Sequence, residues 1–161
     1  MNKLNHVAFI MDGNGRWGKK RYKGRNFGHL RGVETVKKIV KNSIKLKIPI
    51  VTFYVFSSEN WKRPKKEISF LFNLIKSYFT KEIENLVNQG IKINILGEIN
   101  KLSSDIKLTL KKTINLTKKN RKIIVNLAIN YGSKNEILYK FKKTKKNFNI
   151  KKIEKKILIT I

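Results

Sequence analysis

Residues 6 to 17 read H-V-A-F-I-M-D-G-N-G-R-W. The short apolar run from Val7 to Met11 stops abruptly at Asp12, which predicts a buried strand followed by a glycine-rich turn. Gly13 and Gly15 allow the backbone to turn tightly, so that its N–H groups can approach an anion. Asp12 stands at the carboxyl end of the predicted strand, where open α/β sheets bind ligands.

A carboxylate beside an anion-binding turn has a chemical consequence. It repels a phosphate unless a cation lies between them, so the stretch favours a diphosphate bound together with a hard divalent metal such as Mg2+. Taken alone, D-G-N-G is most often an ordinary turn. The stretch matches neither a Walker loop nor a dinucleotide-binding fingerprint, because the glycine spacings of those motifs are absent.

The composition predicts one globular domain over residues 1–161, since 40% of the residues are hydrophobic and 30% are charged. The absence of cysteine excludes disulfides and thiolate metal sites. No secretory signal opens the sequence, and the longest apolar-rich run, Ile48 to Phe56, is too short to span a bilayer. We therefore expect a cytoplasmic protein, with peripheral contact with a membrane left open.

The net charge of +28 suggests an anionic partner such as nucleic acid, a membrane surface or a phosphorylated substrate. Most cations are lysines spread along the chain without interleaved aromatics, and Ile and Asn are abundant too, which indicates a chain-wide bias of composition. We therefore expect no nucleic-acid partner. The arginines are more informative, because arginine binds phosphate in a bidentate manner. Those near the candidate site segments are Arg16, Arg21, Arg25, Arg31 and Arg63.

The apolar pattern predicts alternating strands and helices. A strand over residues 5–11 precedes the turn, and a helix within residues 24–47 has apolar residues at three- and four-residue spacing. Residues 50–56, I-V-T-F-Y-V-F, predict a strand covered on both faces. A helix over residues 65–88 is apolar on more than one side. It is therefore either a doubly packed core helix or one wall of an apolar channel.

The second half of the chain continues this alternation. Residues 91–96 predict a strand near an edge of the sheet, and residues 123–129 predict a buried strand that ends in the polar segment N-Y-G-S. Helices are expected over residues 135–145 and, in a short form, over residues 149–161. Between the two strands, Ser103 or Ser104 caps a further helix, whose inward positions are Ile106, Leu110, Ile114 and Thr117.

The order of elements predicts an α/β fold with a single, mostly parallel β-sheet covered by helices. Three of the four predicted strand exits are polar and contain Gly or Ser. Because the carboxyl ends of parallel strands meet at one edge of a sheet, we expect the site at that edge.

Four segments of the chain together carry a resemblance to a known family. They are the stretch from residue 6, R-N-F-G-H-L-R-G from residue 25, T-F-Y-V-F-S-S-E-N-W-K-R-P from residue 52 and N-L-A-I-N-Y-G-S-K-N-E-I from residue 126. They resemble the cis-prenyltransferase family, the isoprenyl transferases that include bacterial undecaprenyl diphosphate synthases. The resemblance covers nearly the whole chain and implies the family's fold. It also implies a Mg2+-dependent cis-condensation of isopentenyl diphosphate onto an allylic diphosphate such as farnesyl diphosphate, which yields a polyprenyl diphosphate lipid carrier for cell-wall sugars.

The resemblance implies roles for individual residues. Asp12 is implied to be catalytic and linked to Mg2+, and Asn60 is implied to serve in proton removal. Glu67 matches a further carboxylate of the family, without an assigned role. Residues implied to bind substrate are Gly13, Asn14, Gly15, Arg16, Trp17, Arg25, His29, Ser57, Ser58, Glu59, Trp61 and Arg63.

Each of these residues also has an ordinary structural interpretation. His29 lies near a predicted helix start and can serve as a capping or packing residue. Trp17 and Trp61 can belong to the core, and Asn60 can be a turn residue. Their joint occurrence in four ordered segments favours the functional interpretation.

The chain departs from the family pattern after Asn149, where neither an R-T-G-G-E-like segment nor a following S-N-F-type segment occurs. In the family these two segments supply groups for isopentenyl diphosphate, a second metal carboxylate and much of the homodimer contact. We therefore expect a largely present allylic site, an incomplete homoallylic site and a sheet without its last strands. A homodimer is implied by the resemblance alone. The alternatives left open are a catalytically impaired remnant, a partner subunit and a basic module that binds an anionic surface.

Overall fold

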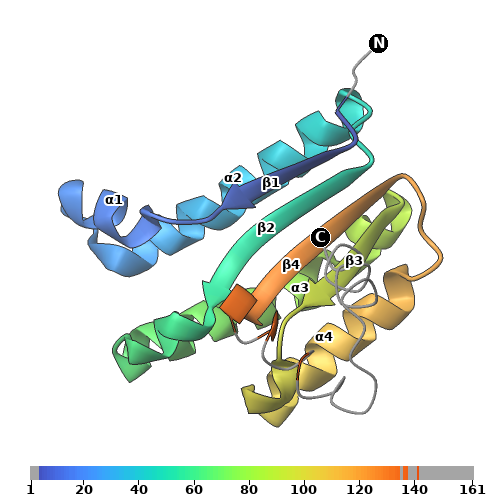
Figure 1. The fold of residues 1–161 in the computed structure, drawn as a ribbon. Coiled ribbons are helices and arrows are strands. Elements are labelled where there is room, and N and C mark those ends of the chain that lie inside the picture. Colours follow the sequence, from blue (N-terminus) through green and yellow to red (C-terminus); the bar gives the residue numbers. More distant parts are fainter. Residues whose placement is uncertain (1–3, 135, 138–140, 142–161) are drawn as a thin grey trace.

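Four parallel strands form the sheet that carries the candidate site (Figure 1). The computed structural model describes residues 4–134, 136, 137 and 141. Within them every strand pair is parallel, so the carboxyl ends of the strands meet at one edge, as the sequence predicts. The strand order is β1-β2-β4-β3, with β1 (His6–Ile10), β2 (Ile50–Ser57), β3 (Ile91–Leu96) and β4 (Ile123–Tyr131).

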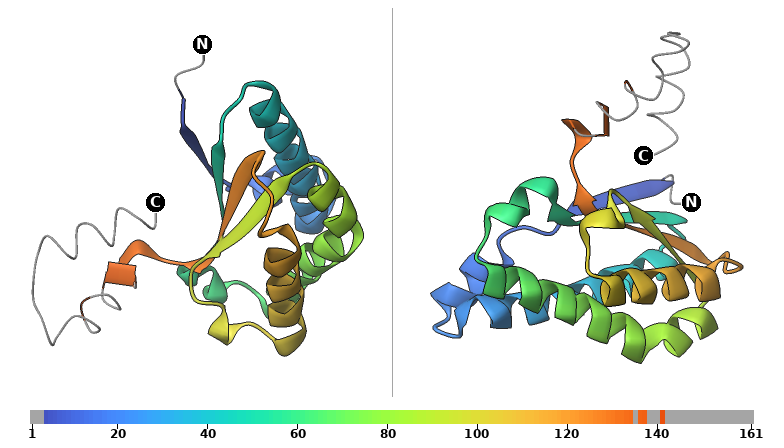
Figure 2. Two further views of the ribbon diagram at one scale, coloured as in Figure 1. Left: turned by 90° about the vertical axis from the view of Figure 1, so that its right-hand side faces the viewer. Right: turned by 90° about the horizontal axis from the view of Figure 1, so that it is seen from below.

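The helices that connect the strands lie on one face of the sheet. Figure 2 shows α2, α3 and α4 together on that face, and α3 contacts both α2 and α4. Two short 3-10 helices, η1 (Ser58–Lys62) and η2 (Ile99–Lys101), follow β2 and β3. None of the helices described is long and apolar enough to cross a membrane. The α-helices are α1 (Asn14–Lys20), α2 (Gly24–Lys45), α3 (Lys65–Asn88) and α4 (Ser104–Thr117).

The core forms between these helices and alternate residues of each strand. Val51 and Phe53 of β2 are completely buried, whereas Thr52 and Tyr54 between them are only partly buried. In the part of the chain that the structure describes, helices therefore cover one face of β2, not the two that its composition predicts. The reason is that β-branched and aromatic residues suit a half-buried strand as well as a fully buried one.

A row of polar side chains crosses the other face of the sheet. Thr52 Oγ1 lies 2.8 Å from His6 Nε2 and accepts a hydrogen bond from Asn126 Nδ2 at 3.1 Å. Asn94 Nδ2 donates to Asn126 Oδ1 at 3.1 Å, so one residue of each strand takes part. The row fixes the register, because a slip of one residue would turn these side chains to the opposite face.

The boundaries of some elements differ from the predictions. The helix predicted over residues 65–88 and the edge strand over residues 91–96 are confirmed, but β4 continues to Tyr131. In α4, Thr113 is buried and Ile114 only partly so. The helices predicted over residues 135–145 and 149–161 fall outside the described residues, apart from residues 136, 137 and 141.

The turn predicted at Asp12 to Gly15 is shorter than expected, because α1 begins at Asn14. Gly13 is its N-cap in the left-handed conformation, with φ 84°, which a residue with a Cβ adopts only at a cost. The Gly13 carbonyl oxygen accepts the N–H of Trp17 at 2.8 Å. The backbone thus passes directly from β1 into a helix that places Asp12 just before its first turn.

Glycines allow α1 to lie directly on α2. A Cβ atom at Gly28 would lie 1.8 Å from the carbonyl oxygen of Asn14, and one at Gly18 would lie 2.2 Å from that of Gly24. Both distances are far below van der Waals contact, so only glycine permits this approach. The contact fixes the beginning of α1 relative to α2.

Candidate active site at the carboxyl edge of the sheet

Asp12 lies where β1 ends and α1 begins. Its Oδ1 accepts the N–H of Gly13 at 2.6 Å, and its Oδ2 accepts a hydrogen bond from Arg16 Nη2 at 2.9 Å. The side chains of Asp12 and Arg16 are 67% and 71% exposed, so their ion pair contributes at most about 1 kcal/mol to folding. The carboxylate is open to solvent and accessible to a cation.

Glu67, in the first turn of α3, gathers three basic side chains although it is only 8% exposed. Arg25 forms a bidentate pair with it, with Nε donating to Oε2 at 2.9 Å and Nη2 to Oε1 at 2.8 Å. His29 Nε2 lies 3.2 Å from Oε1, and Arg63 Nη1 donates to Oε1 at 3.5 Å. Glu67 thus joins the start of α2 to the segment that follows β2. We call these four residues the Glu67 cluster.

Gly15 links this cluster to α1. A Cβ atom at Gly15 would lie 2.8 Å from Cζ of Arg25. Because glycine has no Cβ atom, the Arg25 side chain has room to extend past α1 to Glu67. The beginning of α1, which follows Asp12, is therefore in contact with the Glu67 cluster.

The charges of the cluster leave a positive surface. The hydrogen bond from Arg25 holds the pKa of Glu67 below its usual 4.5 although burial acts in the opposite direction, and the same bond raises the pKa of Arg25. Arg25 and Arg63 remain 35% and 31% exposed, so both guanidinium groups are partly open to solvent while Glu67 holds them. Two cations around one buried carboxylate suit the binding of a phosphate group.

His29 makes the stability of the fold depend on pH. Burial lowers the pKa of His29 below 6.5 although its hydrogen bond with Glu67 acts in the opposite direction. The unfolded chain therefore binds the His29 proton at a higher pH than the folded chain, and stability falls as the pH drops below 6.5. Glu67, whose folded pKa is also lowered, contributes a further loss below about pH 4.5.

We expect the thermal unfolding midpoint of a His29→Gln variant to fall less than that of the unsubstituted protein between pH 7.5 and pH 5. Glutamine retains a donor for Glu67 but does not titrate. The measurement is circular dichroism melting at a series of pH values. Equal pH dependence in the two proteins would show that protonation of His29 does not limit stability.

The segment after β2 is ordered by its own hydrogen bonds. Ser57 is the N-cap of η1, with its Oγ accepting the N–H of Glu59 at 3.2 Å, while Asn60 Oδ1 accepts the N–H of Ser57 at 3.1 Å. Asn60 therefore has a capping role in this structure, which corresponds to the ordinary interpretation of this residue. Its role in proton removal stays a prediction.

Trp61 connects this segment to the end of β4. Its Nε1 donates to Asn130 Oδ1 at 2.8 Å, and its ring stacks on Phe72 and meets Phe56 edge-on, with centroids 5.8 and 5.3 Å away. Asn130 in turn donates through Nδ2 to the carbonyl oxygen of Glu98 at 2.7 Å. Asn130 thus positions the segment after β2. It was not among the predicted site residues, and the only sequence signal for it was its place in the polar segment N-Y-G-S that follows the predicted strand.

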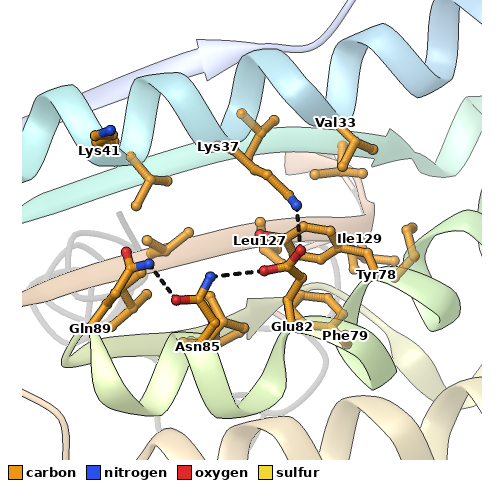
Figure 3. Close-up of a pocket in the computed structure, with 18 residues that line it drawn as sticks. Val33, Lys37, Lys41, Tyr78, Phe79, Glu82, Asn85, Gln89, Leu127 and Ile129 are labelled. Atoms are coloured by element: carbon orange, nitrogen blue, oxygen red, sulfur yellow. Dashed lines mark hydrogen bonds and ion pairs between the residues drawn. The ribbon is translucent and has the colours of Figure 1, made fainter.

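An apolar cavity of about 360 Å³ lies between α2, α3 and the sheet (Figure 3). Its polar rim is a chain of contacts in which Lys37 pairs with Glu82, Asn85 donates to Glu82, and Gln89 donates to Asn85. Burial, together with Glu82, raises the pKa of Tyr78 in the wall to about 12. Apolar lining residues include Val33, Val36, Val40, Ile75, Phe79, Ile93, Val125 and Leu127.

The Glu67 cluster lies toward one end of this cavity. His29 stands four residues before Val33 on α2, and Glu67 stands eight residues before Ile75 on α3. At about 1.5 Å per helical residue, the separations along the helix axes are roughly 6 and 12 Å. The helix predicted over residues 65–88 was interpreted either as a packed core helix or as one wall of an apolar channel. Its counterpart α3 has both features, because it buries Ile68 in the core and also lines the apolar cavity.

A second, more polar cavity of about 920 Å³ opens at the ends of β2 and β4. It brings together four of the predicted residues, Ser57, Ser58, Glu59 and Trp61, with the loop after β3. Neither Asp12 nor Arg25 is among its lining residues in the described part of the chain. The predicted residues thus form two groups, one around Asp12 and the Glu67 cluster and one in this second cavity. The 3-10 helix η1 connects them, because several of its residues line the cavity and Arg63, which follows it directly, belongs to the Glu67 cluster.

Two predicted binding residues point toward other parts of the protein. The Asn14 side chain lies against α2, with Nδ2 2.8 Å from the position of a Cβ atom at Gly32. Trp17 stacks on Phe27 on the outside of the α1–α2 pair, with ring centroids 5.9 Å apart. Their roles in substrate binding stay predictions.

Sequence comparison relates the chain to one family. Residues 10–160 match the family model of undecaprenyl diphosphate synthase. An isoprenyl transferase of Clostridium tetani is 44% identical over 133 residues, which are 83% of this chain and 52% of that protein. One from Rickettsia bellii is 43% identical over 137 residues, which are 85% of this chain and 61% of that protein. The chain therefore spans about half to three fifths of the length of these curated relatives.

Two solved structures are similar to this one. A probable undecaprenyl diphosphate synthase from Campylobacter jejuni gives a TM-score of 0.77 at 29% identity, covering 95% of this chain and 68% of that one. Lavandulyl diphosphate synthase from Lavandula x intermedia, in complex with dimethylallyl diphosphate, gives a TM-score of 0.81 at 28% identity, and the match covers 87% of this chain and 61% of that one.

Proposed function

Because this chain belongs to the undecaprenyl diphosphate synthase family, we propose that it is an isoprenyl transferase. The proposed reaction is the cis-condensation of isopentenyl diphosphate onto an allylic diphosphate such as farnesyl diphosphate, which lengthens a polyprenyl diphosphate. One observation carries the proposal, namely that arginines held on a buried Glu67 lie toward the end of an apolar cavity. A molecule with a diphosphate head and an apolar tail needs both surroundings next to each other.

The head of the allylic substrate is assigned to the Glu67 cluster and the start of α1. The guanidinium groups of Arg25 and Arg63 are oriented by Glu67 and remain partly exposed, so they can donate to phosphate oxygens without first being ordered. Arg16 supplies a third cation beside Asp12. His29, with its lowered pKa, is neutral above pH 6.5 and offers a hydrogen bond rather than a charge.

Asp12 fits a bound Mg2+ when the diphosphate supplies the other ligands. The described residues include no group of three or more His, Asp or Glu side chains that could hold a metal. Mg2+ usually keeps several waters and takes only one or two carboxylates together with substrate phosphates, so the single exposed carboxylate of Asp12 suffices. When bound, the ion would neutralise charge on the departing diphosphate.

In the proposed reaction, the bond between the allylic carbon and the diphosphate oxygen breaks, and both electrons leave with the diphosphate. The double bond of isopentenyl diphosphate forms the new carbon–carbon bond, and that substrate then loses a proton. Arg25 and Arg63 stabilise the charge that develops on the leaving group. Asn60 remains the candidate for guiding the proton, because its Oδ1 accepts the Ser57 N–H and still has a second lone pair.

The tail of the allylic substrate is assigned to the cavity between α2 and α3. The residues that line it are mostly aliphatic or aromatic and come from α2, α3, β3 and β4. A volume of about 360 Å³ lies within the range of small-molecule pockets. Family membership further supports, as proposals, a homodimer, a product that carries cell-wall sugars and a cytoplasmic location.

A Val33→Phe variant tests the assignment of the tail. We expect the added ring to fill the part of the cavity nearest to His29 and to weaken farnesyl diphosphate binding about tenfold, equivalent to losing about two buried CH2 contacts. Binding of inorganic diphosphate should not change. Both affinities are measured by isothermal titration calorimetry in Mg2+ buffer.

The matched control is Val87→Phe, since Val87 lies on α3 but is 37% exposed and does not line the cavity. This variant should bind both ligands like the unsubstituted protein. If Val33→Phe left farnesyl diphosphate affinity unchanged, the tail would not occupy this cavity, and the central observation behind the proposed function would be lost.

A further inference from the structure

The turn between α1 and α2 contains a tyrosine in an unfavourable conformation. Tyr22 has φ 57°, in the left-handed region, and is fully exposed. The turn is held by hydrogen bonds from the N–H of Tyr22 to Lys19 O at 2.9 Å and from that of Arg21 to Gly18 O at 3.2 Å. Glycine or asparagine usually occupies such a position. A solvent-exposed aromatic ring in a strained backbone conformation suggests a role in binding.

Aromatic and cationic side chains alternate around this turn. Trp17 stacks on Phe27 with an interplanar angle of 11°, and the guanidinium of Arg21 lies 4.1 Å from the Trp17 ring centroid. On Phe27, Lys23 and Arg31 lie 4.9 and 5.3 Å from the ring centroid. We call residues 17–31 the α1–α2 corner.

Charge alone does not single out this corner. Residues 13–33 contain seven Lys or Arg residues and no acidic residue, but residues 106–135 contain eight and likewise no acidic residue. The difference lies in the aromatic residues, since the first segment contains Trp17, Tyr22 and Phe27 and the second contains only Tyr131. Trp17, Tyr22 and Leu30 of α2 are 38%, 100% and 46% exposed. The corner is therefore both apolar and cationic on its surface.

The corner is also rigid. The close contacts of Gly18 with Gly24 and of Gly28 with Asn14 hold α1 against α2 without intervening side chains. Its aromatic residues are therefore presented by a fixed backbone and lose little conformational freedom when they bind a surface.

We propose that the α1–α2 corner docks on an anionic lipid bilayer, with Tyr22 and Trp17 at the level of the lipid headgroups. Aromatic rings with a polar tip favour that layer, and neighbouring Lys and Arg side chains extend to lipid phosphates. Each cation near an anionic membrane strengthens binding by about fivefold. The proposal does not rest on the transferase reaction, since it concerns a surface that binds lipid without substrate.

A Tyr22→Gly variant tests this docking. Glycine adopts φ 57° without strain, so the substitution removes the ring while maintaining or improving the fold. We expect its partition coefficient for vesicles of phosphatidylcholine with phosphatidylglycerol to be about fivefold lower than that of the unsubstituted protein. The measurement is vesicle flotation at physiological salt.

Lys47→Gly is the matched control. Lys47 also has positive φ, at 56°, but follows the far end of α2, roughly 30 Å from the corner by helix length. At that distance its charge is screened in physiological salt, so vesicle binding should change less than twofold. A loss equal to that of Tyr22→Gly would attribute binding to diffuse charge and overturn the proposal.

Three further results would also overturn it. They are unchanged vesicle binding by Tyr22→Gly, equal binding to pure phosphatidylcholine vesicles, and absence of vesicle binding by the unsubstituted protein. The third result, combined with Tyr22-dependent binding of single-stranded RNA, would identify the corner as a nucleic-acid site instead. A Lys20→Gln variant with intact Tyr22 should show a comparable loss of vesicle binding, about fivefold, if the headgroup phosphates are the ligand.

Discussion

An Asp12→Asn variant is expected to transfer isopentenyl units about a thousandfold more slowly than the unsubstituted protein while retaining its fold. Asparagine is nearly isosteric and can still accept the Gly13 N–H, but it has no negative charge with which to bind Mg2+. Metal stabilisation of a departing diphosphate contributes several kcal/mol, and about 4 kcal/mol corresponds to three orders of magnitude in rate. The lost ion pair with Arg16 is exposed and contributes at most about 1 kcal/mol to stability.

The assay combines purified protein, farnesyl diphosphate, radiolabelled isopentenyl diphosphate and Mg2+, and counts extracted polyprenyl product. Asp105→Asn is the matched control, since Asp105 is also an exposed aspartate in an ion pair, with Lys76, but lies on α4. We expect this control to retain full turnover. Equal turnover by Asp12→Asn and the unsubstituted protein would remove Asp12 from the proposed site.

A different outcome concerns the unsubstituted protein. If it binds farnesyl diphosphate tightly in the presence of Mg2+ but forms no product, the allylic half of the reaction is assigned to this chain and condensation is not. The partner-subunit alternative then gains support, because condensation would require groups that this chain does not supply. The chain spans about half to three fifths of the length of these curated relatives.

Gly28→Ala is expected to destabilise the protein by about 3 kcal/mol. A Cβ atom there would lie 1.8 Å from the Asn14 carbonyl oxygen and 2.7 Å from its carbonyl carbon, so the backbone of α1 must move. Overpacking of this kind typically costs about 1–3 kcal/mol and sometimes more, which exceeds the gain of about 1 kcal/mol from helix propensity. The unfolding midpoint should fall by about 10 °C for a chain of this size.

Gly32→Ala, one turn further along α2, is the matched control. There the nearest atoms belong to the Asn14 side-chain amide, at 2.8 to 3.2 Å, which can rotate away. We expect a change of less than about 1 kcal/mol, because the helix gain offsets the small rearrangement. Thermal unfolding followed by circular dichroism compares the two variants, and equal midpoints would contradict the argument that backbone contact between α1 and α2 requires glycine at position 28.

Local patterns were sufficient to predict the strands, the long helices and the edge of the sheet where the candidate site residues lie. The strand at residues 91–96 and the helix at residues 65–88 were predicted at their observed boundaries, because hydrophobic periodicity and turn residues act over a few positions. Asp12 was likewise chosen as a candidate from its neighbours, since it follows an apolar run and precedes glycines, and its catalytic role stays a prediction. The short helix α1 was missed, because its seven residues include two glycines, Gly15 and Gly18, and show no apolar period.

The pairing of side chains within the candidate site could not be predicted from the sequence. Glu67 lies 42 residues from Arg25 in the chain, and Asn130 lies 69 residues from Trp61, so no local pattern connects them. Their meeting depends on parallel strands that bring distant connections to one edge, and on glycines that let α1 lie on α2. The sequence therefore determined which residues are chemically suited to the site. The packing of the sheet and helices decided which of them touch, because those contacts exist only once the chain has folded.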